Sequence, residues 1–490
     1  MRLACAAAAL ALAACGSGHG SVKAVGTTVI AADGAPGFPA TRWLPAKPTY
    51  VLTARSIADL QRAVRDAADS IGALAGITAA DVAEGTGELL GVDLFGPDSV
   101  AKLGLDDASG IALFSDLASP TIVVHLKDPA AFRRFVDSRK APKRSQIVDG
   151  VEITTIELKY PLSWAVDQDW LWIHAALPEV GEQPTAWFTA SHTPHAAAWA
   201  DNWRWTMSAA SPKAGVVGYM DVGGLVTHYI PRTKDLAECA QLYRAPGRVG
   251  VSVEGDGKHA GGKLVVELGS VAGAIQGTLL PPPPGWDATR ANAPIAMQWN
   301  ADVQRVAGAL GPCMVALGAH DFDVVKATGI RAVRGMLLSL DLGAKKGAGA
   351  VSLDVAGAAY IRQKLDEIPG RGMLERDRSF GPYKGKHLSI PFGPPAFDYV
   401  VTDQVVLAAM GEDVLTHVIA GTAASAPPPV FALDVEPPAL PAATWEDLFR
   451  ALDLRHAQAV AAQLMGWRDI HFAIRVEGTS LVLAATGDRQ

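Results

Sequence analysis

The spacing of apolar positions along the chain changes from strand-like to helical and back, and this order recurs. In the segment 50–126 a short strand-like run is followed by Ile57, Leu60 and Val64, which are spaced for one face of a helix. A second short helical segment and two strand-like runs complete the segment. The order strand, helix, helix, strand, strand returns at 215–268, 293–355 and 430–485. We therefore expect four short units of similar organisation.

Two of these units carry a matching extension. After the first, Asp128 and Pro129 suit the N-cap and first position of a helix, and strand-like runs follow over 151–174. After the third, a helical segment at 359–368 precedes strand-like runs over 388–410. The match predicts an internal duplication. Hairpins with helices between them indicate an α+β fold of repeated modules, each a mostly antiparallel sheet with helices packed on one face.

Shifts in composition predict the domain boundaries. Residues 15–48 are rich in Gly, Ala and Pro without a sustained period, which is typical of a flexible tether. Four consecutive prolines at 281–284 continue neither a helix nor a central strand. The predicted division is a signal peptide at 1–14, the tether at 15–48, a first α+β domain at 49–280, a proline-rich linker at 281–293 and a second α+β domain at 294–490.

The first residues predict the destination of the protein. Arg2 precedes an apolar run, Leu3 to Ala14, that is too short to span a bilayer and has the layout of a secretory signal. The run ends in Leu12-Ala13-Ala14-Cys15, which resembles the lipobox of bacterial lipoproteins. The resemblance implies that the Cys15 thiol carries a lipid with palmitate-type acyl chains, so that the partner at this end is a membrane. The alternative is an ordinary secretory signal cut near Ala14, with Cys15 an incidental thiol.

The resemblance also bears on location. Gly16, rather than an aspartate, follows the cysteine. By analogy with the sorting of bacterial lipoproteins, this implies an anchor in the cell outer membrane, facing the periplasm. The body of the chain, above all residues 91–116 and 123–136, resembles a loosely defined class of bacterial envelope proteins with repeated α+β modules. That class supplies no catalytic residues to carry over.

Composition and charge narrow the classes of partner. The chain has 490 residues, of which 49% are hydrophobic and 19% charged, a globular composition. Its formal net charge of −7 argues against nonspecific electrostatic binding to nucleic acid or other polyanions. After Cys5 and Cys15, the remaining cysteines are Cys239 and Cys313. An even pair in an oxidising compartment is a possible disulfide, and two separately buried thiols are the alternative.

Motifs for catalysis and metal binding are weak. His192 and His195 have helical spacing, but Pro194 lies between them and no further ligand motif accompanies them, so we predict a loop and no metal site. The glycine-rich stretch 343–349 is placed between two strands and is predicted to be a β-turn rather than a phosphate loop. Tryptophans gather between residues 164 and 205, which indicates core filling, with an apolar groove as the alternative.

These observations predict a non-enzymatic, lipid-anchored envelope protein that binds a partner protein or an apolar ligand. We predict no catalytic residues, metal, cofactor or nucleic-acid partner. The alternative is a lipid-anchored periplasmic hydrolase whose site assembles from residues distant in the sequence, which motif patterns do not reveal.

Overall fold

The fold is known from a computed structural model. It describes residues 35–75, 84, 96, 98–115, 119–157, 160–177, 184–193, 196–223, 247–302, 305, 333–367, 374–389, 396–411, 413–421, 427–451 and 456–490. Strands of the described part join into one 20-stranded sheet. All neighbouring strands whose register is resolved are antiparallel. The predicted α+β class with a mostly antiparallel sheet is confirmed.

The elements divide into two sets at the proline run. The strands of the first set are β1 (Tyr50–Ala54), β2 (Ile111–Ser115), β3 (Thr121–His125), β4 (Lys143–Val148), β5 (Val151–Ile156), β6 (Leu162–Asp167), β7 (Trp170–Ala175), β8 (Val216–Asp221), β9 (Arg248–Gly255) and β10 (His259–Glu267). The helices described with them are η1 (Pro39–Trp43), α2 (Ile57–Ala75), α4 (Ser99–Lys102), α5 (Pro129–Asp137), α6 (Ala186–His192), α7 (Ala196–Ala209) and α10 (Ser270–Gln276).

The strands of the second set are β11 (Ile295–Trp299), β12 (Val333–Asp341), β13 (Lys346–Leu353), β14 (Leu374–Phe380), β15 (Tyr383–Ser389), β16 (Phe397–Val401), β17 (Val405–Met410), β18 (Phe431–Val435), β19 (Trp467–Glu477) and β20 (Ser480–Arg489). The helices described with them are α11 (Trp286–Ala291), α14 (Val355–Asp366), α15 (Val414–Ala420), η5 (Pro437–Ala439), α16 (Ala442–Ala451) and α17 (Ala457–Leu464).

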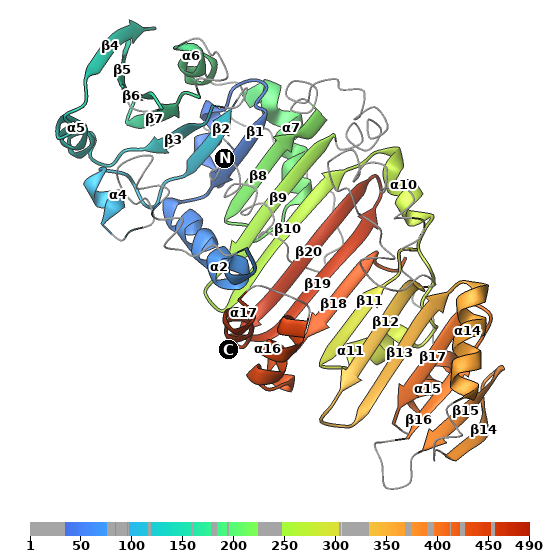
Figure 1. Ribbon diagram of the computed structural model, residues 1–490. Helices are drawn as coiled ribbons and strands as arrows, with labels where there is room; N and C mark the ends of the chain where they lie inside the picture. Colours follow the sequence, from blue (N-terminus) through green and yellow to red (C-terminus); the bar gives the residue numbers. More distant parts are fainter. Residues whose placement is uncertain are drawn as a thin grey trace.

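The two sets have the same strand order in space. Pairing gives β4-β5-β6-β7-β3-β2-β1-β8-β9-β10 in the first half. From the other edge, the second half reads β14-β15-β16-β17-β13-β12-β11-β18-β19-β20. Each strand therefore has its counterpart ten strands later. The halves meet where β10 pairs with β20, in the middle of the sheet in Figure 1, with β4 and β14 at opposite ends.

Helices cover both faces of the first half, so the expected packing on one face is wrong. Successive side chains of a strand point to opposite faces. On β1, Val51 belongs to a core with η1, α6 and α7, whereas Ala54 belongs to a core with α2 and α5. Because the strands carry apolar residues at both odd and even positions, each face needs its own cover.

The folded part begins earlier than the predicted tether allows. Phe38, Trp43 and Leu44 are buried in the same core as Val51; Trp43 belongs to η1, and Phe38 and Leu44 flank it. Pro39 occupies the first position of this short helix, where its missing N–H costs nothing. At least from Ala35 on, residues assigned to the tether are thus packed against the sheet, because large aromatic rings there find an apolar surface to cover.

The proline run lies between β10 and β11, where the strand order starts again. The two predicted domains nevertheless share one sheet, because β20 of the second pairs with β10 of the first. Within the predicted linker, Trp286 is completely buried in the core of the second half, and the Gly285 N–H donates to the Val418 carbonyl over 2.9 Å.

Among the described helices, none combines the length and the apolar character that crossing a membrane requires.

Candidate functional site

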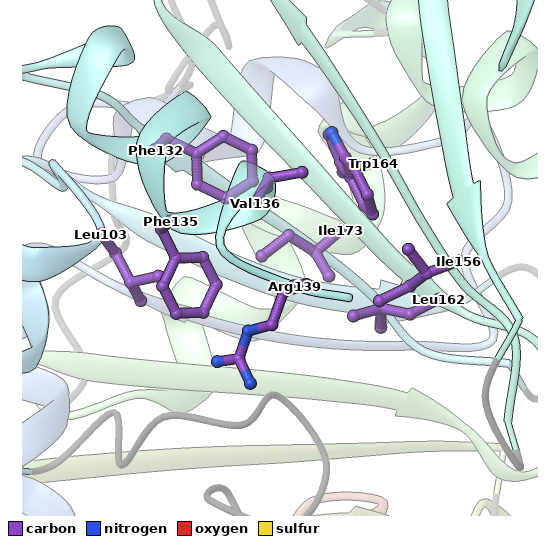
Figure 2. Close-up of a pocket in the computed structure, with 9 residues that line it drawn as sticks. All are labelled: Leu103, Phe132, Phe135, Val136, Arg139, Ile156, Leu162, Trp164 and Ile173. Carbon is purple, nitrogen blue, oxygen red and sulfur yellow. The ribbon is translucent and has the colours of Figure 1, made fainter. Parts of the chain in front are cut away.

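An apolar hollow lies in the first half, between α5 and strands β5, β6 and β7 (Figure 2). Its cavity volume is about 40 Å³, and the hollow is partly open to solvent. Eight of the nine side chains that line it are apolar, and the ninth is an arginine. They are Leu103, Phe132, Phe135, Val136, Arg139, Ile156, Leu162, Trp164 and Ile173.

Helix α5 supplies one wall because its apolar residues share a face. Phe132, Phe135 and Val136 are spaced i, i+3 and i+4, and Arg139 continues this face one turn beyond, just after the helix ends. The side chains of Phe132 and Phe135 also contact each other, with ring centroids 6.5 Å apart. The face therefore presents three apolar groups and then a cation.

The start of α5 is fixed by its N-cap, as the sequence predicts. The Asp128 carboxylate accepts hydrogen bonds from the N–H groups of Ala130 (3.0 Å) and Ala131 (3.1 Å). The bond from Ala131, followed by that from Ala130, holds the pKa of the Asp128 carboxyl below its usual range. Gly104, with φ of 67°, accepts hydrogen bonds from Lys127 and Asp128 at its carbonyl, which anchors this end of the helix to the loop after α4.

The opposite wall is one face of the sheet. In the registers of β5, β6 and β7, Ile156 lies opposite Leu162, and Trp164 lies opposite Ile173. Paired residues point to the same face, so these four side chains form a continuous apolar surface. The ring of Trp164 contacts Phe132 of α5 edge-on, with centroids 6.4 Å apart. The two walls thus meet on one side and leave the hollow on the other.

A basic segment borders the hollow. The guanidinium carbon of Arg139 lies 4.5 Å from the ring centroid of Phe135. Three further basic residues follow in the sequence, of which Lys143 donates to the Val136 carbonyl over 2.9 Å and lies 3.4 Å from Asp137. Arg144 lies 2.9 Å from a carboxylate oxygen of Glu157. These contacts tie β4 and β5 to the end of α5.

In the second half, the counterparts of β4, β5 and β6 carry a cluster of polar groups. On β14, β15 and β16, the Tyr399 hydroxyl donates to Glu375 over 2.9 Å, and the Lys386 ammonium lies 2.7 Å from the same carboxylate oxygen. Burial, and then the bond to Glu375, raises the pKa of the Tyr399 hydroxyl, while the bond from Lys386 lowers the pKa of Glu375. The outer strands of the second half therefore carry a hydrogen-bonded polar cluster around Glu375.

Most of the clustered tryptophans are core residues, as expected. Trp170, Trp172, Trp187, Trp199 and Trp203 are buried on the face of the sheet opposite the hollow. Trp164 is half-buried and lines the hollow. Of these tryptophans, Trp164 is therefore the one that lines an apolar groove, which was the alternative interpretation of the cluster.

His192, half of the weak metal motif, is bound within the protein. Its Nε2 lies 2.9 Å from an Asp167 oxygen, and its ring stacks on Phe188 at 4.6 Å between centroids. His195 lies outside the described residues. Within the described part of the chain, no three or more His, Cys, Asp or Glu side chains gather in a way that could hold a metal ion.

A histidine, a carboxylate and a serine lie close together away from the hollow, but their hydrogen bonds are not arranged as in a catalytic triad. Near the end of β3, Ser109 donates to Asp106 over 2.6 Å, and His125 Nδ1 lies 3.4 Å from the same carboxylate oxygen. The bond from Ser109 is the main reason that the pKa of Asp106 is lowered. In a serine hydrolase the hydroxyl must donate to the histidine, which in turn bonds the acid. Here the hydroxyl and the imidazole both face the acid, so neither activates the other.

Of the remaining sequence predictions, the structure confirms a turn and leaves the cysteines untested. The stretch 343–349 does hold a turn, between β12 and β13, in which Asp341 accepts from the Ala344 N–H over 2.9 Å. Cys15, Cys239 and Cys313 lie outside the described residues, as does the signal segment. The hollow itself was not foreseen, although the i, i+3, i+4, i+7 spacing from Phe132 to Arg139 could have indicated an apolar helix face ending in a cation.

Comparisons with known proteins give no family. No protein-family model matches the chain, and no curated protein matches it. Among solved structures, crystal forms III, I and IV of TP0453 are similar over 48%, 46% and 47% of this chain and 84%, 77% and 81% of theirs. In each case the identity is 10% and the TM-score is 0.26, a likeness too weak to support any argument.

Proposed function

We propose that the protein is a lipid-anchored envelope protein that binds an apolar ligand in the hollow beneath α5 without transforming it. The observation that carries the proposal is the lining of the hollow, eight apolar side chains and one arginine. Binding sites for small apolar molecules are typically concave and mostly apolar. The lining contains no hydroxyl, thiol, imidazole or carboxylate that could act as nucleophile or base.

The anchor belongs to the same proposal. Acylation at Cys15 would hold the chain at a membrane, in the outer membrane on its periplasmic side. Residues between Cys15 and Ala35 would then separate the lipid from the packed part of the protein. A ligand site near a membrane surface is suited to molecules that partition between lipid and water.

We also propose that the two halves descend from one duplicated unit, as the recurring sequence pattern predicts. The identical strand order of the halves and the pairing of β10 with β20 support this. Under this proposal the halves kept the same sheet while their side chains diverged, for example in the polar group around Glu375.

A neutral fluorescent probe of apolar sites tests the ligand proposal. N-phenyl-1-naphthylamine should bind the purified protein saturably at one site. Leu162, half-buried at the start of β6, faces the hollow, so Leu162→Trp should fill the space and weaken binding about tenfold or more. Leu374→Trp makes the same change at an exposed position on β14, at the far end of the sheet, and should leave binding unchanged.

The result that would overturn the proposal is equally definite. Either unsaturable binding in the wild-type protein, or equal affinity in Leu162→Trp and Leu374→Trp at matched folded content by circular dichroism, places the probe elsewhere.

A further inference from the structure

We infer that the ligand is an amphiphile with an anionic head group, its apolar chain under α5 and its head group on Arg139. This inference rests on the proposed function and adds the chemical class of the ligand. Two observations support it: Arg139 is the one charged side chain among the nine that line the hollow, and the segment beside the hollow is rich in basic residues.

Arg139 is placed to contact both the apolar chain and the head group of such an amphiphile. Its methylene stem lines the hollow with the apolar residues, and its guanidinium lies beside the Phe135 ring at 4.5 Å, at the border of the apolar cluster in Figure 2. A guanidinium has five N–H donors, so it can add a head group to the contacts it already makes. Its planar fork matches the two oxygens of a carboxylate or phosphate.

The surroundings of the hollow favour a negative head group. The segment 139–144 contains four basic residues, whereas the chain as a whole has a net charge of −7. Two of the four, Lys143 and Arg144, lie close to Asp137 and Glu157, so cations still outnumber these two carboxylates. A cationic head group would be repelled here. A neutral head group could accept a hydrogen bond from the guanidinium but would gain less than an anion.

Displacement of N-phenyl-1-naphthylamine by two molecules that differ only in head group tests the inference. Decanoate and 1-decanol share the same chain length. In Arg139→Gln, decanoate should displace the probe about five- to tenfold less well, since a charge-assisted hydrogen bond is lost. Displacement by 1-decanol should be unchanged, and this also shows that the variant is folded. Arg139→Lys, which keeps the charge but not the fork, should lie between the two.

Arg133→Gln is the matched control, because Arg133 is an exposed arginine of α5 that does not line the hollow. It should leave both displacement curves unchanged. If Arg139→Gln and Arg133→Gln have the same effect on decanoate, the head-group contact is wrong while the ligand proposal stands. If neither decanoate nor 1-decanol displaces the probe, the proposed function itself fails.

The anionic amphiphile could be a free fatty acid or a membrane lipid, and a second arm distinguishes them. The Cys15→Ser protein, loaded with probe, is mixed with vesicles of phosphatidylglycerol or of phosphatidylcholine. Competition by phosphatidylglycerol vesicles that is lost in Arg139→Gln assigns the site to a membrane lipid. Competition by decanoate without any effect of the vesicles assigns it to a free amphiphile.

Discussion

His259 on β10 and Asp488 on β20 lie opposite each other where the two halves of the sheet join, and His259 Nδ1 is 2.9 Å from Asp488 Oδ1. Arg468 of β19 bonds the other oxygen of the same carboxylate. The bond from His259 is the largest cause of a lowered pKa at Asp488, and the charge of Arg468 acts in the same direction. One carboxylate thus joins strands from both halves of the chain.

This contact predicts a pH dependence. The pKa of Asp488 in the folded state lies below its unfolded value of about 4. The ionised carboxylate therefore stabilises the fold at a pH above that unfolded value, and this contribution is lost as the pH falls from about 4 through the folded pKa. Asp488→Asn should lower the free energy of unfolding at pH 7 by no more than about 1 kcal/mol, because His259 and Asp488 are 33% and 37% exposed. The deficit should shrink below pH 4 in urea titrations. Asp447→Asn, at an exposed pair on α16, is the control. A deficit that grows in acid would contradict the assignment.

Gly104 should be the least replaceable glycine near the hollow. Its φ is 67°, and an added Cβ would collide with the Asp128 carbonyl oxygen at the start of α5. Gly150, in the turn between β4 and β5, has φ of 83° but open space around it. Gly150→Ala should cost about 1 kcal/mol for backbone strain alone. Gly104→Ala should cost about 3 kcal/mol and weaken probe binding, since α5 must move. Equal losses in urea titrations would mean that the collision is relieved elsewhere.

Trp286 should anchor the segment that the sequence indicates to be a linker. It is completely buried, whereas Trp299 on β11 is 37% exposed. Trp286→Ala should lower the free energy of unfolding by about 3–5 kcal/mol, and Trp299→Ala by about 1 kcal/mol. Trypsin should cut after Arg290 faster in Trp286→Ala than in the wild type, where Arg290 lies 2.6 Å from Asp434. Rapid cutting after Arg290 in the wild-type protein would show a free linker.

Acylation should depend on Cys15. Cys15→Ser should move the protein from the membrane fraction to the soluble fraction and abolish incorporation of radiolabelled palmitate. Cys5→Ser, within the signal segment, is the control and should change neither. Unchanged palmitate incorporation in Cys15→Ser would leave the ordinary secretory signal as the correct interpretation.

Cys239 and Cys313 can bridge only where their Cα atoms come within about 7 Å. Mass spectrometry of the unreduced mature protein decides between a disulfide and two separate thiols: one pair of peptides joined through these residues would show the bond. Two thiols that react with iodoacetamide after denaturation without reductant would instead show separate burial.

The sequence by itself determined the features that depend on neighbouring residues. Asp128 and Pro129 predicted the start of α5 because capping satisfies backbone groups within one turn. The turn at 343–349 and the recurring order of strands were also visible, because periodicity reflects which side chains must face an apolar layer.

Tertiary structure decided what depends on distant residues. Pairing of β10 with β20, more than two hundred residues apart, makes two expected domains into one sheet, and no local pattern encodes that choice of partner. Burial of Trp43 and Trp286 likewise depends on surfaces built from other elements. The hollow arose in the same way: Phe135 and Arg139 reveal a helix face, but only the packing of α5 across Leu162 and Ile173 leaves space between them, because cavities are set by how elements meet rather than by the residues of either one.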